Sequence, residues 1–171
     1  MGWGHAAENP ALVEKLDSLR NGPKQIRMIG PTAEAMRAVG DKIGSSIIAQ
    51  SLGIPTVPWS GSGVFIDTAK FRPLDETEYA KCHIHDLESG LSLCETIGFP
   101  IMIKASNGGG GKGIRIVHGK DDFSMAYNQV IVEVPNSPVF LMKVVQKARH
   151  IEVQILGDMA SISTFEERLL V

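Results

Sequence analysis

The most informative segment of this sequence is Ile103-Lys104-Ala105-Ser106-Asn107-Gly108-Gly109-Gly110-Gly111-Lys112-Gly113-Ile114-Arg115. Apolar residues lead into it from Pro100 and continue beyond it to Val117, and both runs are typical of β-strands. Four consecutive glycines between two strands predict an antiparallel hairpin with a glycine-rich tip. Glycine-rich loops bind phosphate groups in several folds, and the elements on either side of the loop decide among them.

Two common phosphate-binding loops do not fit this segment. The glycines from Gly108 to Gly113 formally satisfy the pattern G-x-G-x-x-G, but a dinucleotide-binding loop opens a helix, whereas a strand follows here. A Walker A loop requires Ser or Thr after its lysine, and Lys112 is followed by Gly113. We therefore exclude both interpretations.

A flap that closes over a polyphosphate is the function that remains for this hairpin. Because glycine has no Cβ, several neighbouring backbone N–H groups can turn toward one anion and approach it closely. Lys112 at the tip and Lys104 in the preceding strand add positive charge. Such a flap would fold over the phosphates of ATP. A flexible hairpin tip without a ligand stays open as the alternative.

The composition is that of an ordinary globular domain and excludes several classes of protein. The 171 residues include 17 Lys and Arg and 19 Asp and Glu, and the net charge of −2 indicates neither a nucleic-acid partner nor a membrane surface. No apolar stretch approaches the ~18 residues of a membrane span, and the N-terminus lacks a secretory pattern. Cys82 and Cys94 show no metal-ligand spacing and are expected to be buried free thiols in a reducing compartment.

Helical and strand patterns alternate along the chain and predict an α/β (α+β) fold. Helices are expected between Asn9 and Asn21 and at 33–39, 41–52, 86–97 and 121–132, and further strands at 26–29, 139–142 and 150–156. The segment from Trp59 to Pro73 has no clean period and is expected to be an exposed loop at a subdomain boundary.

Other polar residues have a local explanation beside any functional one. Lys42 begins a predicted helix directly after Asp41, where a solvated lysine is the simplest interpretation. His150 begins a predicted strand with Glu152 on the same face, as in an ordinary polar edge. No histidine shows metal-ligand spacing with carboxylates. The pattern of residues alone therefore assigns no catalytic group and no metal ligand.

Several long segments give the sequence a specific family resemblance. The glycine segment resembles that of biotin carboxylase, an ATP-grasp enzyme, and Arg149-His150-Ile151-Glu152-Val153-Gln154 resembles the next signature of this family. The opening Gly2-Trp3-Gly4-His5-Ala6-Ala7-Glu8-Asn9-Pro10 is similar to the form found in eukaryotic-type acetyl-CoA carboxylase. The segments Pro55-Thr56-Val57-Pro58-Trp59-Ser60-Gly61-Ser62-Gly63 and Glu133-Val134-Pro135-Asn136-Ser137-Pro138 point to the same subgroup.

The resemblance implies an ATP-binding role for particular residues. Lys42 and Lys104 match the two phosphate-binding lysines of the family, and His150 matches a histidine near the ribose. Two further sets match the flap over ATP and the hinge that receives adenine, partly through backbone groups: Gly108, Gly109, Gly110, Gly111 and Lys112 for the flap, and Met142, Lys143 and Val145 for the hinge.

The resemblance also implies an activity and its partners. The family is an ATP-dependent ligase that carboxylates biotin with bicarbonate through a carboxyphosphate intermediate, with Mg²⁺ or Mn²⁺ on the phosphates. Biotin is carried on a separate domain, and the carboxyl group passes to acetyl-CoA to give malonyl-CoA for fatty acid synthesis. The implied partners are ATP, bicarbonate, and the biotin carboxyl carrier and carboxyltransferase regions of the parent enzyme. The implied compartment is the cytoplasm, with a plastid or another organelle as the alternative.

The resemblance finally implies an ATP-grasp fold fragment. Residues 1–40 match the end of a Rossmann-like pre-ATP-grasp subdomain, 41–73 a linking helix and loop, 74–142 the lid subdomain, and 143–171 the start of the C-terminal subdomain. The match extends to about Asp158, before the family's metal-binding glutamates and the arginines that hold bicarbonate and biotin. The isolated chain is therefore expected to be inactive. The alternative function is a truncated, non-catalytic nucleotide-binding or interaction fragment.

Overall fold

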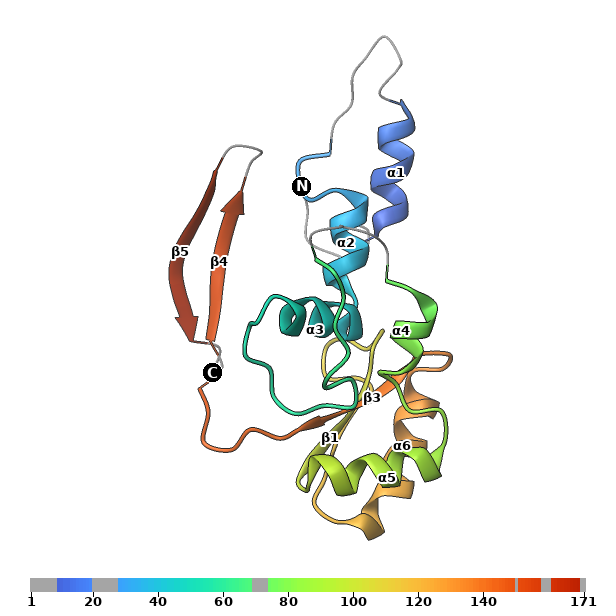
Figure 1. The fold of residues 1–171 in the computed structure, drawn as a ribbon. Helices are drawn as coiled ribbons and strands as arrows, with labels where there is room; N and C mark the ends of the chain where they lie inside the picture. Colours follow the sequence, from blue (N-terminus) through green and yellow to red (C-terminus); the bar gives the residue numbers. More distant parts are fainter. Residues whose placement is uncertain (1–8, 20–27, 69–73, 150, 158–160, 170–171) are drawn as a thin grey trace.

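The computed structural model describes residues 9–19, 28–68, 74–149, 151–157 and 161–169, in which five helices precede a mixed region of strands and one helix (Figure 1). In chain order the elements are α1 (Pro10–Ser18), α2 (Ala33–Gly40), α3 (Lys42–Ser51), α4 (Glu76–Ala80), α5 (Leu87–Ile97), β1 (Ile101–Ala105), β2 (Ile114–Val117), α6 (Lys120–Glu133), β3 (Val139–Lys143), β4 (Ile151–Gly157) and β5 (Ile162–Leu169). This order confirms the mixed α/β class expected from the sequence.

The strand before the glycine loop is the centre of a three-stranded antiparallel sheet with the order β2-β1-β3. Lys104 of β1 lies opposite Ile114 on β2 and opposite Phe140 on β3. The hairpin predicted from the sequence is therefore present, and the glycine loop connects β1 directly to its neighbour β2.

One face of this sheet carries the larger hydrophobic core. Every second residue of β1, namely Ile101, Ile103 and Ala105, is fully buried, as the alternation of side chains along a strand requires. These side chains share one cluster with Phe123 and Val130 of α6 and with apolar residues of α5. Both helices were predicted from their apolar periodicity.

The opposite face of the sheet is covered along β3, where Phe140 and Met142 both contact one apolar cluster. There Phe140 of β3 packs with Ile43 and Ile47 of α3 and with Trp59 in a second buried cluster. The rings of Trp59 and Phe140 meet edge to face, with 6.1 Å between their centroids. The indole N–H of Trp59 donates to Oε1 of Gln50 on α3 at 2.9 Å. This cluster fixes α3 against the sheet.

Polar side chains define where the first five helices begin. Asn9, Thr32, Asp41, Asp75 and Asp86 precede α1 to α5 in turn, and each accepts a backbone N–H of the first helical turn. Such caps satisfy N–H groups that have no partner inside the helix. Asp41 also ends α2, so α2 and α3 meet at this single residue.

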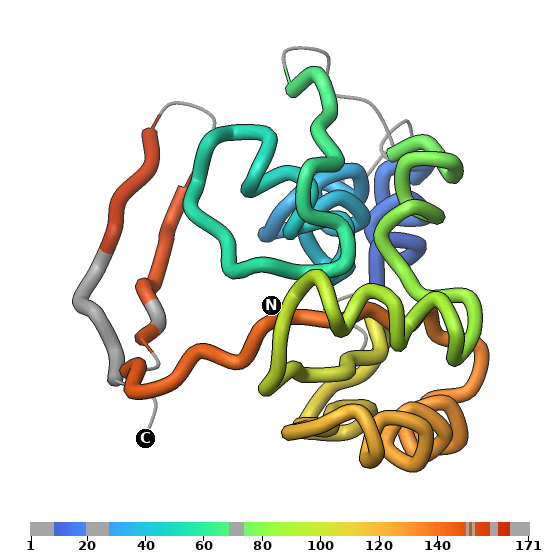
Figure 2. Tube along the Cα trace, turned by 60° about the horizontal axis from the view of Figure 1, so that its bottom comes forward, coloured from blue at the N-terminus to red at the C-terminus, as the bar shows by residue number. Residues whose placement is uncertain are grey.

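Strands β4 and β5 form a separate two-stranded antiparallel sheet. It lies to one side of the other elements and is reached from β3 through an extended segment (Figures 1 and 2). Ile155, Leu156 and Ile162 of this hairpin are each more than half exposed. The hairpin therefore contributes little to either core.

Three local expectations differ from the structure. The segment that begins at Trp59 is not an exposed loop at its start, because Trp59 and Gly61 are buried; residues 69–73 lie outside the described part. Of the strand expected at 26–29, Met28 and Ile29 are described and are not in a strand. Helix α4 and strand β5 were not predicted, because α4 is one short turn held by a capping box and β5 shows no clear alternation.

Candidate functional site

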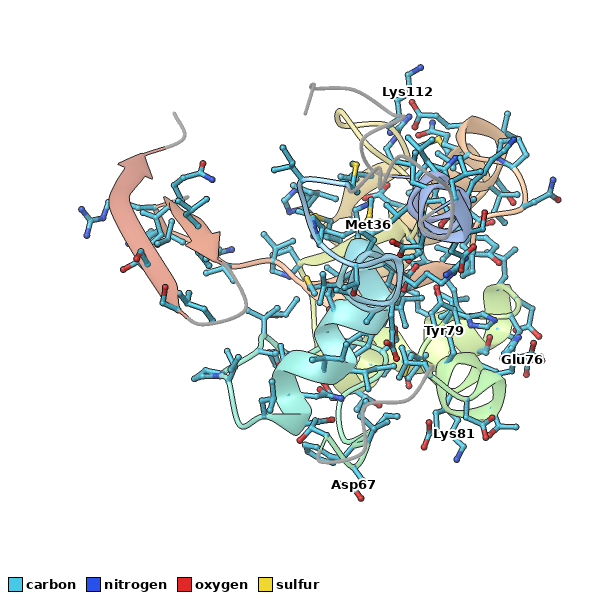
Figure 3. The ribbon with its side chains drawn as sticks, turned by 90° about the horizontal axis from the view of Figure 1, so that it is seen from above. Met36, Asp67, Glu76, Tyr79, Lys81 and Lys112 are labelled. Carbon is cyan, nitrogen blue, oxygen red and sulfur yellow. The ribbon has the colours of Figure 1, made fainter. Side chains whose placement is uncertain are left out.

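The glycine loop has a packed root and an open tip. At the root, the N–H of Ala105 donates to the carbonyl of Gly113 at 2.8 Å, and the N–H of Gly108 donates to the carbonyl of Ala105 at 3.2 Å. A Cβ at Gly108 would lie 2.5 Å from the carbonyl oxygen of Lys112, whereas a Cβ at Gly109 would meet nothing within 4 Å. Lys112 is exposed, and Figure 3 shows its side chain at the outer edge of the molecule. The tip is therefore free to approach a ligand.

A carboxylate and an arginine hold the second side of the root. Oε2 of Glu133, the last residue of α6, accepts the N–H of Gly113 at 2.9 Å. The same oxygen lies 3.0 Å from the guanidinium of Arg115. The hydrogen bond from Gly113, together with Arg115, lowers the pKa of the Glu133 carboxyl. This anchor joins β2 to the end of α6 and was not foreseen from the sequence.

Lys42 lies beside the first side of the root. Its ammonium donates to the carbonyl of Ser106 at 2.9 Å and also to the carbonyl of Gly108. These contacts span more than sixty residues of sequence, so only the packing of α3 against the sheet can create them. The structure therefore brings a sequence-predicted lysine to the predicted flap.

The residue before Lys42 completes a hydrogen-bond network at the same place. Oδ2 of Asp41 accepts the hydroxyl of Ser106 at 2.5 Å and the hydroxyl of Tyr79 at 2.9 Å. Burial is the largest of the causes that raise the pKa of Tyr79 to about 12, so its hydroxyl keeps its proton at neutral pH. Asp41 was foreseen only as a helix start, and Tyr79 and Ser106 were missed, because no local pattern links the three positions.

Lys104 lies on the sheet face opposite the larger core. Its ammonium approaches Sδ of Met142 on β3 at 3.7 Å. Burial, and secondly the charge of Lys42, lowers the pKa of Lys104. Lys42 binds the carbonyl of Ser106, two residues after Lys104, so both lysines lie at the root of the loop. Among the ion pairs between described side chains, none includes Lys42 or Lys104.

An apolar strip lies beside Lys104 on the same sheet face. Met102 pairs with Ile116 on β2 and with Met142 on β3, and residues directly opposite each other share a face. Ile116 is 50% exposed, and Met102, Ile114 and Met142 are partly exposed. The register of the sheet therefore places a partly open apolar surface next to the half-buried Lys104. The sequence analysis did not single out Ile114 or Ile116 as candidate site residues.

The three predicted hinge residues differ in their placement. Met142 faces Lys104, as described. The Lys143 side chain points elsewhere, because its ammonium donates to the carbonyls of Gly98 at 2.8 Å and Phe99 at 2.7 Å. Val145 is 56% exposed in the segment after β3. His150 lies outside the described residues, so its predicted role has no structural counterpart here.

Two general features bear on chemistry at this site. Within the described ranges, no three His, Cys, Asp or Glu side chains form a cluster that could hold a metal ion. In the same ranges, no helix is long and apolar enough to cross a membrane.

Comparisons with known proteins identify the family of this chain. The family described as "Carbamoyl-phosphate synthase L chain, ATP binding domain" matches residues 69–164. An acetyl-CoA carboxylase from Cryptosporiopsis sp. is 50% identical over 160 residues, and one from Saccharomyces cerevisiae is 48% identical over 163 residues. Each match covers 92% of this chain and 7% of the relative, so the chain spans a small part of the curated relatives' length.

Solved structures give the same answer for the fold. The biotin carboxylase of Campylobacter jejuni, in a complex titled β-γ-ATP, matches with a TM-score of 0.75 and 28% identity over 95% of this chain and 32% of its own. The biotin carboxylase domain of Hydrogenobacter thermophilus 2-oxoglutarate carboxylase, with MgADP, ADP and bicarbonate, matches with a TM-score of 0.74 and 29% identity over 97% of this chain and 32% of its own. The chain therefore belongs to the carbamoyl-phosphate synthase L chain ATP-binding domain family, as a biotin carboxylase-type ATP-grasp region related to eukaryotic acetyl-CoA carboxylases.

Proposed function

We propose that this chain binds ATP as part of the biotin carboxylase component of an acetyl-CoA carboxylase. In the whole enzyme, ATP would drive the carboxylation of biotin by bicarbonate, and the carboxyl group would pass to acetyl-CoA to form malonyl-CoA. The biotin carboxyl carrier and carboxyltransferase regions are the proposed partners, and the cytoplasm is the proposed location. Support comes from the relatives named acetyl-CoA carboxylase and from similar structures titled with an ATP analogue, MgADP and bicarbonate.

One observation supports ATP binding most directly. Lys42 contacts the root of the glycine loop, its charge contributes to the lowered pKa of Lys104, and neither lysine has a carboxylate partner among the described side chains. Two ammonium groups without a carboxylate partner in the described part of the chain, beside an apolar strip, are complementary to a nucleotide, which has a charged polyphosphate at one end and a flat base at the other. A polyphosphate would neutralise the lysines, and a flat base would cover the strip.

Each protein group that we propose to bind the nucleotide has a distinct physical role. The backbone N–H groups of Gly109, Gly110 and Gly111 would turn toward the phosphates when the tip closes, because no neighbouring atom restricts them. Lys42 and Lys104 would balance the phosphate charge, which is the main source of catalysis in phosphoryl transfer.

The base of the nucleotide would contact the apolar strip on the sheet. Ile116 offers exposed apolar surface there, Ile114 and Met142 are partly exposed beside it, and Val145 lies in the segment that follows. The ammonium of Lys143 is bound at the turn before β1, so we assign Lys143 a role through its backbone only. The role of His150 near the ribose remains a proposal from family resemblance.

A divalent cation, Mg²⁺ or Mn²⁺, would arrive with the nucleotide and neutralise part of its charge. The described residues contain no carboxylate cluster that fits such an ion. We therefore assign the cation no ligand among these residues and derive no catalytic step from it.

Calorimetric titration of the chain with MgATP tests the proposed binding. The variant Lys104→Met keeps the length of the side chain and removes its charge. We expect it to weaken binding roughly 10- to 100-fold, because hydrogen bonds to charged groups contribute about 1.5–3 kcal/mol. Lys81→Met is the matched control, because Lys81 is an exposed lysine directly after α4. Equal affinities for the wild type and both variants would refute this site.

An assay of phosphate release distinguishes a catalytic chain from the non-catalytic alternative. For the isolated chain we expect MgATP binding without phosphate release that depends on biotin and bicarbonate. Phosphate release that requires biotin and disappears in Lys104→Met would show that the chain is catalytic on its own.

A further inference from the structure

The junction between α2 and α3 holds the glycine loop through a side chain that is itself held in place. Asp41 accepts the N–H of Gly44 through Oδ1 at 2.7 Å, which caps α3. Its second oxygen, Oδ2, is therefore directed to the hydroxyls of Ser106 and Tyr79. The carboxylate has a hydrogen-bond partner on both oxygens, so its charge is satisfied without the neighbouring lysine.

This arrangement leaves the Lys42 ammonium for the backbone of the loop. Two consecutive residues, Asp41 and Lys42, both hydrogen-bond to Ser106. Asp41 accepts the hydroxyl of Ser106, and Lys42 donates to its carbonyl. Ser106 is 2% exposed, and both bonds are partly buried. A displacement of Ser106 would break both contacts, and the Lys42 ammonium would lose an acceptor that holds it in place.

Tyr79 connects these hydrogen bonds at Ser106 to a third element. It lies on α4, whose start is fixed by a capping box between Asp75 and Glu78. Its hydroxyl reaches Asp41 at 2.9 Å and Ser106 at 3.4 Å. Three elements far apart in sequence therefore meet at the loop root.

From this geometry we infer that Asp41, Tyr79 and Ser106 form a positioning triad, which holds Lys42 and the root of the glycine loop in place for the nucleotide. The triad touches no phosphate itself and acts through Lys42. This inference rests on the proposed function for its role in binding, but not for its effect on the loop root.

The first test needs no nucleotide. Tyr79→Phe removes one hydroxyl from the triad and keeps the ring. We expect amide hydrogen exchange at Gly108 and Asn107 to become roughly tenfold faster or more, because the root opens more often when a bond to a charged acceptor is lost. Tyr127→Phe is the matched control, since Tyr127 lies in the larger core on α6 and outside the triad. Unchanged exchange in Tyr79→Phe would overturn the inference.

The second test separates positioning from general stability. We expect Tyr79→Phe to weaken MgATP binding severalfold in the wild-type background, and to have little effect in a Lys42→Met background, because the triad acts through that ammonium. A similar loss in both backgrounds would overturn the inference. If the wild-type chain does not bind MgATP, the proposed function fails, while the exchange experiment still decides whether the triad holds the loop.

Discussion

Replacing Gly113 by alanine is the most direct test of how the root of the loop is built. Gly113 has φ +70°, a left-handed conformation that L residues adopt at a cost of about 1–2 kcal/mol. An added Cβ would lie 2.7 Å from Cγ2 of Val134 and 2.8 Å from Cβ of Ala105. Both neighbours belong to the packed end of the larger core, so neither can move freely.

The expected loss of stability follows from these two contributions. Overpacking of a well-filled site costs typically about 1–3 kcal/mol. Together with the backbone cost, Gly113→Ala should lower the free energy of unfolding by about 2–5 kcal/mol. For a chain of this length that corresponds to a fall of about 4–20 °C in Tm. The N–H of Gly113 would also shift away from Glu133, which loosens the second anchor of the loop.

Thermal unfolding followed by circular dichroism measures this effect, and the same loop supplies the control. Gly109 has no left-handed φ, and a Cβ there would meet nothing within 4 Å. Gly109→Ala should therefore change stability by no more than about 0.5 kcal/mol. A Tm for Gly113→Ala equal to that of Gly109→Ala would refute the packed root.

Three further predictions follow from individual side chains. Burial and the charge of Lys42 lower the pKa of Lys104, whereas bound phosphate favours its charged form. The affinity for MgATP should therefore fall as the pH rises through that lowered pKa. Calorimetric titrations across the alkaline range should show this dependence in the wild type and not in Lys104→Met. Trp59→Ala should cost about 3–5 kcal/mol in urea unfolding, because the side chain is 2% exposed at the centre of the second cluster. Cys82 and Cys94 are buried, and burial raises the pKa of each to about 11, so neither should react with iodoacetamide at neutral pH until the chain unfolds, as mass spectrometry can show.

The sequence predicted the elements whose patterns are local. The hairpin around the glycine loop, α3, α5 and α6 all follow from strand-like runs, apolar periodicity and capping residues such as Asp86 and Gly98. The free, buried state of Cys82 and Cys94 was also predicted correctly. These features depend on neighbours within one or two turns of the chain, so a single sequence contains the information needed.

The features that were missed depend on contacts between distant segments. The start of the segment after Pro58 has the composition of an exposed loop, yet Trp59 is buried against Gly61, where a Cβ would lie 2.4 Å from the indole ring. The hydroxyls of Tyr79 and Ser106 reach Asp41 across 38 and 65 residues. No local periodicity in the sequence predicts these contacts, because they depend on how the two cores pack.

The register of one strand pair explains why the two predicted lysines come together. Lys104 and Phe140 lie opposite each other, so both project from the same face of the sheet. Phe140 is buried in the cluster that contains Ile43, the residue next to Lys42 at the start of α3. Packing of α3 on Phe140 therefore carries Lys42 to the end of β1, where Lys104 and the root of the glycine loop lie. A shift of β3 by one residue would turn Phe140 to the other face and remove the surface on which α3 rests. The charged site beside the loop is in this sense a consequence of hydrophobic packing, and the apolar residue at position 140 does as much to create it as the lysines themselves.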